Sequence, residues 1–283
     1  MVPAPPVRRR LVGKALRRYR ENLGYSLHDV AAILECDPSK LSRIETGQRG
    51  IRAKELRELL GEYGIAGEQL EILALLADPR GAFGWFRDYD DVLHGAFRDY
   101  LILETAAARV WAYEAQQVPA LLQTRAYARA LAETDPVLED DAARDRAAEA
   151  VIARQCAILG EQRPDVRLVI GQAALHQQVG TPEVMNEQLR YVAHAAESSG
   201  TVTVQVLPFE SGAHAAAGDG SLAVLQFTGT AGLGLVHLGG IAGGVCLEGR
   251  GDLAAYAQAF DQLRAFALSP AQSALLLRGL AGD

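Results

Sequence analysis

The sequence predicts a mainly α protein of two domains, in which five N-terminal helices are followed by a helical and mixed-sheet α+β domain. Between residues 11 and 77, apolar residues recur at helical spacing in five short segments. Pro79 and Gly81 then interrupt that pattern. From Val166 onward, apolar residues alternate with polar ones, as they do in half-buried strands. We therefore place the domains at residues 1–80 and 81–283.

The first three helices follow from capping residues and apolar stripes. A first helix is expected over residues 11–24. Ser26 is suited to cap a second helix, and Asp37 with Pro38 to begin a third, which Gly47 ends. The remaining two helices are predicted at residues 53–63 and 69–77. Two short helices joined by a tight turn, at residues 26–47, form the central motif of this domain.

The second helix of this motif, residues 38–46, has a polar and basic outer face. Burial of Leu41 and Ile44 leaves four side chains pointing outward, which are Ser39, Lys40, Ser42 and Arg43. Hydroxyl and cationic groups on one short helix are suited to hydrogen bonds with phosphates and base edges in the major groove of DNA. We expect Arg43, and Lys40 second to it, to contact bases. Phosphate contacts are expected mainly from Ser39, Ser42, Arg49 and Arg52.

The charge distribution agrees with this interpretation. The chain has a net charge of -7, yet its first 57 residues contain 13 Lys+Arg against 6 Asp+Glu. A basic segment attracts a polyanion, while an acidic remainder limits indiscriminate binding. Three successive arginines, Arg8 to Arg10, precede the first predicted helix. They are either an arm that follows phosphates or a solvated tail, and the sequence leaves both alternatives open.

The motif resembles a known family, the XRE type of helix-turn-helix regulators related to the Cro and C1 repressors of phages. The resemblance depends on residues 16–24, on Ala31, and on the ending SKLSRIETG at residues 39–47. It implies a compact five-helix DNA-binding domain. It also implies a buried or half-buried ion pair between Arg20 and Glu45, which we interpret as structural. The family often has glutamine where this chain has Leu27, so no phosphate contact is expected there.

The second domain is predicted from periodicity as helices followed by strands. Phe83 to Tyr100 is rich in aromatic residues, which indicates packing between domains or protomers, with a ligand pocket as the alternative. Helices are expected at residues 102–116, 124–133, 140–160, 183–196, 252–267 and 270–280. Strands are expected at residues 166–170, 201–206, 221–227 and 234–238.

This second domain also resembles a family, the uncharacterised C-terminal domain DUF5753 found in helix-turn-helix regulators of actinomycetes. The resemblance depends on five sequence segments: VPALLQT at 118–124, the Arg154-Gln155 pair, AALHQQVGTPEVMNEQL at 173–189, VTVQVLPFESGAH at 202–214 and FALSPAQSALLL at 266–277. Gln172 stands where the family tends to have an acidic residue, and the VHLGG word lacks a common glutamate. The resemblance implies an antitoxin-like partnership with a small neighbouring protein.

No residue pattern indicates catalysis, a cofactor or a metal site. Cys36, Cys156 and Cys246 are too far apart in sequence for a zinc-ligand pattern, and they fit a reducing cytoplasm. The histidines occur singly, and the glycine-rich segment 238–251 has no phosphate-loop ending. We expect no enzyme activity, no cofactor, no metal and no membrane association, and a cytoplasmic location at the nucleoid.

These observations predict a transcriptional regulator that reads double-stranded DNA. It would act as a homodimer whose second domain joins the protomers, so that two helices 38–46 enter successive major grooves on a pseudo-palindrome. The alternative is an antitoxin-like or ligand-sensing module, in which a small partner protein or a metabolite binds the acidic second domain and controls DNA binding.

Overall fold

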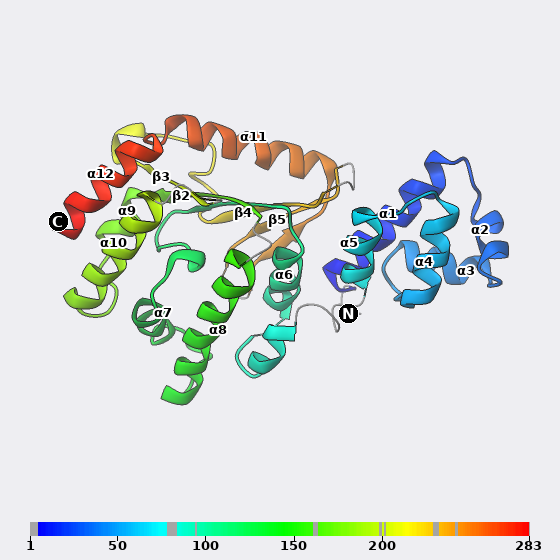
Figure 1. The fold of residues 1–283 in the computed structure, drawn as a ribbon, viewed down its shortest axis with the longest axis horizontal. Helices are drawn as coiled ribbons and strands as arrows, with labels where there is room; N and C mark the ends of the chain where they lie inside the picture. Colours follow the sequence, from blue (N-terminus) through cyan, green and yellow to red (C-terminus); the bar gives the residue numbers. More distant parts are fainter. Residues whose placement is uncertain are drawn as a thin grey trace.

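The structure, a computed structural model, describes residues 5–77, 84–93, 95–160, 164–197, 200, 202–228, 232–240 and 243–282. Figure 1 shows a group of small helices on the right and a sheet flanked by helices on the left. This arrangement confirms the predicted fold class. The expected boundary at residues 78–81, Phe83 and the strand residue Thr201 lie outside the described residues.

The N-terminal region contains the five predicted helices. They are α1 (Val7–Asn22), α2 (Leu27–Ile33), α3 (Pro38–Glu45), α4 (Ala53–Glu62) and α5 (Glu68–Ala77). Leu16, Leu41, Leu56 and Leu59 are fully buried at their centre. The first helix begins at Val7, earlier than predicted, because Pro6 precedes it with a fixed φ and the Val7 N–H finds an acceptor in Asp99. The three arginines at 8–10 therefore belong to a helix, and are neither a free arm nor a tail.

The second region is built on one mixed six-stranded sheet in the order β3-β2-β1-β4-β5-β6. The strands are β1 (Arg109–Glu114), β2 (Asp165–Gly171), β3 (Val202–Leu207), β4 (Leu222–Gln226), β5 (Gly234–Leu238) and β6 (Val245–Leu247). The pairs β1–β2 and β2–β3 are parallel, whereas β4, β5 and β6 continue the sheet in antiparallel pairs. The first strand thus lies inside the sheet, where its parallel and antiparallel halves meet.

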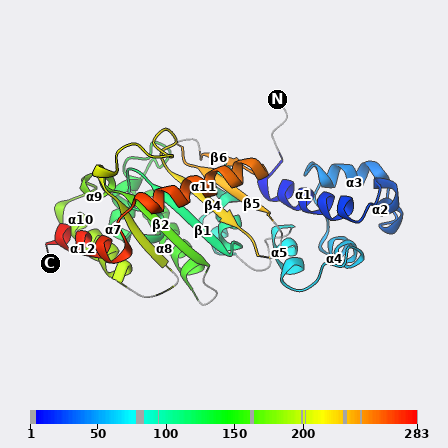
Figure 2. The same ribbon diagram turned by 90° about the horizontal axis from the view of Figure 1, so that it is seen from above.

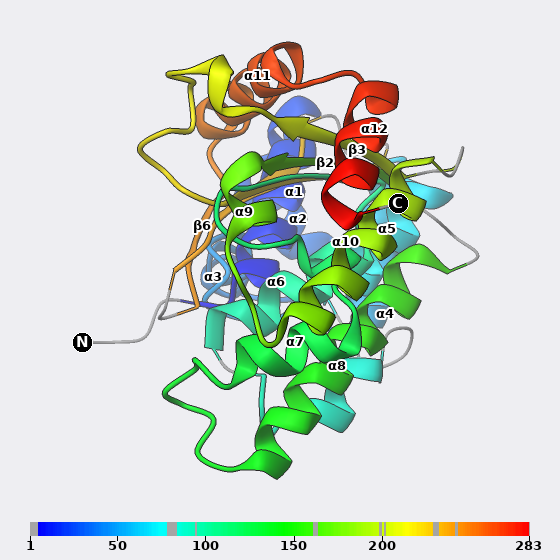
Figure 3. The same ribbon diagram turned by 90° about the vertical axis from the view of Figure 1, so that its left-hand side faces the viewer.

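Helices cover both faces of this sheet, as Figures 1 and 3 show. One face packs on α11 (Arg250–Phe266) through Trp111 of β1 and Phe260 of α11, whose rings stack at 5.7 Å. The other face is covered by helices from the middle of the chain. They are α6 (Gly95–Thr105), α7 (Arg125–Ala132), α8 (Asp141–Leu159), α9 (Gln172–His176) and α10 (Pro182–Glu197). The last helix, α12 (Pro270–Ala281), packs on α10 and β3. Three short 3-10 helices complete the described elements: η1 (Gly84–Tyr89), η2 (Ala120–Leu122) and η3 (Phe209–Ser211).

The prediction of one long helix over residues 102–116 is wrong. The helix α6 ends at Thr105, and residues 109–114 form β1. Val110, Trp111 and Tyr113 are buried on opposite faces of the strand because helices cover both sides of the sheet. A strand buried on both faces has a continuous apolar pattern, which periodicity cannot distinguish from a buried helix.

The aromatic residues near the start of the second region pack inside it. Trp85 lies edge-on to Phe86, and Phe97 stacks on Tyr100. Tyr100 in turn stacks on His237 of β5 with ring centroids 4.4 Å apart. These rings therefore pack within the second region of one chain, whereas packing between domains or protomers, or a ligand pocket, was expected.

Two acidic side chains of the second region hold α1. Asp99 of α6 accepts a hydrogen bond from the Val7 N–H and lies 3.6 Å from Arg8. Glu248, whose side chain is only 4% exposed, pairs with Arg10 and Lys14. Figure 2 shows α1 beside the β6 end of the sheet. Since buried apolar residues also continue from the helices into the sheet, the two regions share a packed and charged interface.

Candidate nucleic-acid interface

The motif helix α2 begins with a complete capping box. The Ser26 hydroxyl accepts a hydrogen bond from the Asp29 N–H at 3.2 Å, and the Asp29 carboxylate accepts one from the Ser26 N–H at 2.7 Å. These bonds satisfy two amide groups that have no partner within the helix. The turn to α3 then uses Glu35 at a φ of 45°, the one described residue other than glycine in the left-handed region. The turn is thus closed at the cost of some backbone strain.

The helix α3 presents the predicted polar face. Asp37 caps it by accepting from the Ser39 N–H at 2.8 Å, and Pro38 occupies the first position. The side chains of Leu41 and Ile44 are buried, whereas Ser39 and Arg43 are exposed.

Ser42 and Lys40 are half-buried. Lys40 differs from the expectation of a free cation, because its ammonium group lies 2.9 Å from the carboxylate of Glu55 on α4. This ion pair also holds the pKa of Glu55 below its usual value, the hydrogen bond from Lys40 being the largest cause. A contact from Lys40 to DNA requires that this pair opens.

Close packing against α1 determines the position of α3. A methyl group at Gly13 would lie 2.5 Å from the carbonyl oxygens of both Ile44 and Glu45, so only glycine permits this helix crossing. Gly47, at a φ of 75°, ends α3 directly against the backbone of Arg10. The helix α3 is therefore seated on α1 by close backbone contacts at two glycines.

The ion pair implied by the family resemblance is present. The Arg20 guanidinium donates to both carboxylate oxygens of Glu45, at 2.7 and 2.9 Å, and a third bond reaches the Tyr25 carbonyl at 2.9 Å. The hydrogen bond with Glu45 is the largest cause that raises the pKa of Arg20 above its usual value. Both side chains are buried between α1 and α3, so the pair fastens these helices together and lies away from the exposed face.

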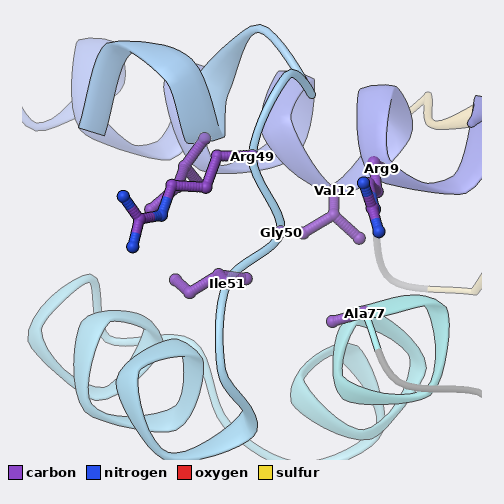
Figure 4. A pocket seen from close by; sticks show the side chains of 7 residues that line it. Arg9, Val12, Arg49, Gly50, Ile51 and Ala77 are labelled. Carbon is purple, nitrogen blue, oxygen red and sulfur yellow. The ribbon is translucent and has the colours of Figure 1, made fainter. Parts of the chain in front are cut away.

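The remaining predicted cations are available to a ligand. Arg43, Arg49 and Arg52 are exposed, and none of them forms an ion pair within the described part of the chain. Arg43 is aligned along its own helix by a 3.2 Å hydrogen bond from Nε to the Ser39 carbonyl. The Arg49 N–H donates to the Arg43 carbonyl at 2.9 Å, which fixes the backbone just after α3. Figure 4 shows Arg49 extending from this segment.

The structure thus brings five of the six predicted residues onto α3 and the segment after it, with Arg52 as the N-cap residue of α4. One further cation, Arg9 of α1, lies beside Gly50 of this segment. Sequence periodicity did not single it out, because its place depends on the way α1 packs against α3.

A second polar cluster lies under α6 and α8, against the sheet. Arg154 of α8 pairs with both carboxylate oxygens of Glu104, at 2.6 and 2.7 Å, and the Tyr100 hydroxyl donates to Glu104 at 2.7 Å. Burial raises the pKa of Glu114 to about 7, against the opposing effects of a hydrogen bond with Ser221 and the charge of Arg154. This arrangement joins α6 and α8 to the sheet.

Within the described residues, no group of three or more histidine, cysteine or acidic side chains is placed to hold a metal ion. No helix in the described ranges combines the length and apolar character that crossing a membrane requires.

Comparison with protein families gives two matches. Residues 11–73 match a family model described as a helix-turn-helix domain, and residues 97–279 match the Domain of unknown function (DUF5753). No curated protein and no solved structure matches the chain. The helix-turn-helix match, together with the exposed basic face of α3, indicates DNA binding and a role in transcriptional regulation. The chain therefore belongs to the DUF5753 family, and a helix-turn-helix domain precedes its DUF5753 domain.

Proposed function

We propose that this protein is a sequence-specific transcriptional regulator that binds a pseudo-palindromic operator as a homodimer. The observation that carries the proposal is the exposed face of α3, where Ser39 and Arg43 are accessible and no acidic side chain pairs with Arg43 in the described chain. A rigidly seated helix whose arginine forms no ion pair in the described residues is suited to bidentate hydrogen bonds with guanine in the major groove. Two such helices, one turn of DNA apart, require a two-fold dimer.

The roles proposed for the six residues follow from their positions. Arg43 reads bases, while Ser39, Ser42, Arg49 and Arg52 contact phosphates. Lys40, held by Glu55, orients α3 against α4 in the free protein and reaches DNA only after exchange of its partner. We propose that this activity uses no covalent chemistry, cofactor or metal. We also propose that the protein is located at the nucleoid.

The test is selection from a random duplex library at near-physiological salt. The wild-type protein should enrich a two-fold symmetric site, and Arg43→Ala should relax the preference at one position of each half-site. One good bidentate contact gives about 1–3 kcal/mol of discrimination. Arg52→Ala should weaken specific and random duplexes by the same factor, because phosphates contain no sequence information. Equal losses on both kinds of DNA for both variants would refute this division of roles.

A second function is proposed for the DUF5753 domain, namely control of DNA binding by a small partner protein or a metabolite. The specific support is the contact of Asp99 and Glu248 with α1, because these side chains join the second domain to the helix on which α3 is seated. A ligand that moves α6 or the end of β6 would thereby change the orientation of α3. Co-purification of a small protein, or a rise in melting temperature with a metabolite fraction, separates this function from simple repression.

A further inference from the structure

The three successive arginines at the start of α1 have different surroundings. Residues in an α-helix are rotated by about 100° from one to the next, since there are 3.6 per turn. Arg8 lies 3.6 Å from the carboxylate of Asp99, and the Nε of Arg10 donates to Glu248 at 2.8 Å. Arg9 points instead toward the segment that follows α3, where its Nε lies 3.8 Å from the position that a Cβ on Gly50 would occupy.

Arg9 also differs from the other cations of its helix. In the described chain, the side chain of every other lysine or arginine of α1 contacts a carboxylate, a carbonyl or an aromatic ring, whereas the Arg9 side chain forms no hydrogen bond or ion pair. It lines a small hollow together with Arg49, Gly50 and Ala77, among others (Figure 4). Figure 4 places the Arg9 and Arg49 side chains on opposite sides of the backbone at Gly50.

Two guanidinium groups beside an exposed glycine backbone make a positive surface without an internal counter-charge. The two groups flank the Gly50 backbone, and both attract an anion that approaches this segment (Figure 4). The absence of a side chain at Gly50 lets a ligand approach the main chain closely. Guanidinium groups are well matched to phosphate oxygens, with which they form strong charge-assisted hydrogen bonds.

We propose that Arg9, together with Arg49 and the backbone at Gly50, binds a backbone phosphate of the DNA duplex next to the groove occupied by α3. This inference rests on the proposed DNA binding and adds a contact from α1 that the motif itself does not contain. The ion pairs of Arg8, Arg10 and Lys14 with the second domain hold the N-terminal half of α1 in place. The Arg9 side chain is thereby preorganised, which reduces the entropy lost on binding.

The test compares Arg9→Ala with Arg17→Ala as its matched control. Arg17 lies on the same helix, is exposed, and pairs with Glu21 at 2.7 Å. Its replacement by alanine changes the net charge of the protein by the same amount as Arg9→Ala does. Dissociation constants are measured on the selected operator and on a random duplex, over a salt range of about 50 to 200 mM. The variant Arg9→Ala should weaken both complexes by a similar factor, about threefold to tenfold, and lower the slope of log K against log salt by about 1. The control should leave the slope unchanged.

A further variant separates a phosphate contact from a structural role. Arg9→Lys keeps the positive charge and should retain the wild-type salt slope. The inference would be overturned if the wild-type protein selects an operator and Arg9→Ala binds it with the same affinity and the same salt slope. That result would leave the proposed function intact. The inference would also be overturned if Arg9→Lys loses affinity while neither Arg9→Ala nor Arg9→Lys changes the salt slope, because Arg9 would then have a structural role. A wild-type protein that binds no duplex would refute the proposed function together with the inference.

Discussion

Substitution of Gly13 by alanine tests the helix crossing that positions α3. The added methyl group would lie 2.5 Å from two carbonyl oxygens, those of Ile44 and Glu45, and both belong to the backbone. A flexible side chain could rotate away from such a contact, but a helix backbone must move as a unit. We therefore expect α1 and α3 to separate by part of an ångström along their whole contact.

The expected magnitude combines two opposing effects. Alanine in a helix interior is favoured over glycine by about 0.5–1 kcal/mol. Overpacking of a close contact costs about 1–3 kcal/mol, and a contact between backbones belongs at the upper end of that range. Gly13→Ala should therefore lower the free energy of unfolding by about 2 kcal/mol. Gly61→Ala on α4 is the matched control, because no atom beyond the neighbouring backbone of its own helix lies within 4 Å of the new methyl group, and it should raise stability by up to about 1 kcal/mol.

Urea unfolding followed by circular dichroism measures both variants, and operator affinity is measured in parallel. The Gly13 variant should lose stability and operator affinity together, since the contact that destabilises it also displaces α3. The control should keep wild-type affinity. If Gly13→Ala proves as stable as Gly61→Ala, the close α1–α3 crossing derived from the structure is incorrect.

Three further changes probe the remaining features. Glu45→Gln leaves the buried Arg20 guanidinium without its counter-charge and should cost about 3–5 kcal/mol in a urea melt. Glu21→Gln removes an exposed, solvent-screened partner and should cost far less, so equal losses would contradict the assigned role of the pair. Glu35→Gly relieves the left-handed backbone of the turn and should raise stability by about 1 kcal/mol, a gain that Glu35→Ala must not reproduce. The pKa of Glu114 is raised by burial, so the folded state binds its proton more tightly than the unfolded state does. The contribution of Glu114 to stability is therefore greatest below its unfolded pKa of about 4.5 and is lost as the pH rises to about 7 and above, a decline of up to about 3 kcal/mol. Glu114→Gln should remove this decline in melts between pH 5 and 8, and a decline that persists in the variant would assign it to other groups.

The helix-turn-helix domain was predictable because its signals are local. Ser26 and Asp37 cap their helices within three residues of the amides they satisfy, and Gly47 ends α3 at a positive φ. Such contacts depend on neighbours in sequence, which periodicity and residue type describe well. The pairing of Arg20 with Glu45 followed from the family resemblance and was confirmed.

The sheet was predicted less completely. Strands β2 to β5 are short apolar or alternating runs bounded by turns, and all four were expected. The inner strand β1 was mistaken for part of a helix, and the short strand β6 was not expected, since three residues give no period. Which residues pair across the sheet, such as Val110 with Val166 and Leu225, depends on partners more than fifty residues away.

By itself the sequence determined the caps, the apolar stripes and the basic composition of the N-terminal region, because each of these belongs to the chain before it folds. Only the tertiary structure decided which charges remain available for a ligand. Lys40 is paired by Glu55, and Arg10 is paired by Glu248 from the far end of the chain, while Arg9 between its paired neighbours remains uncompensated in the described residues. The physical reason is that a charge is neutralised by whatever lies within a few ångströms in space, and the fold brings together residues that the sequence separates by more than two hundred positions.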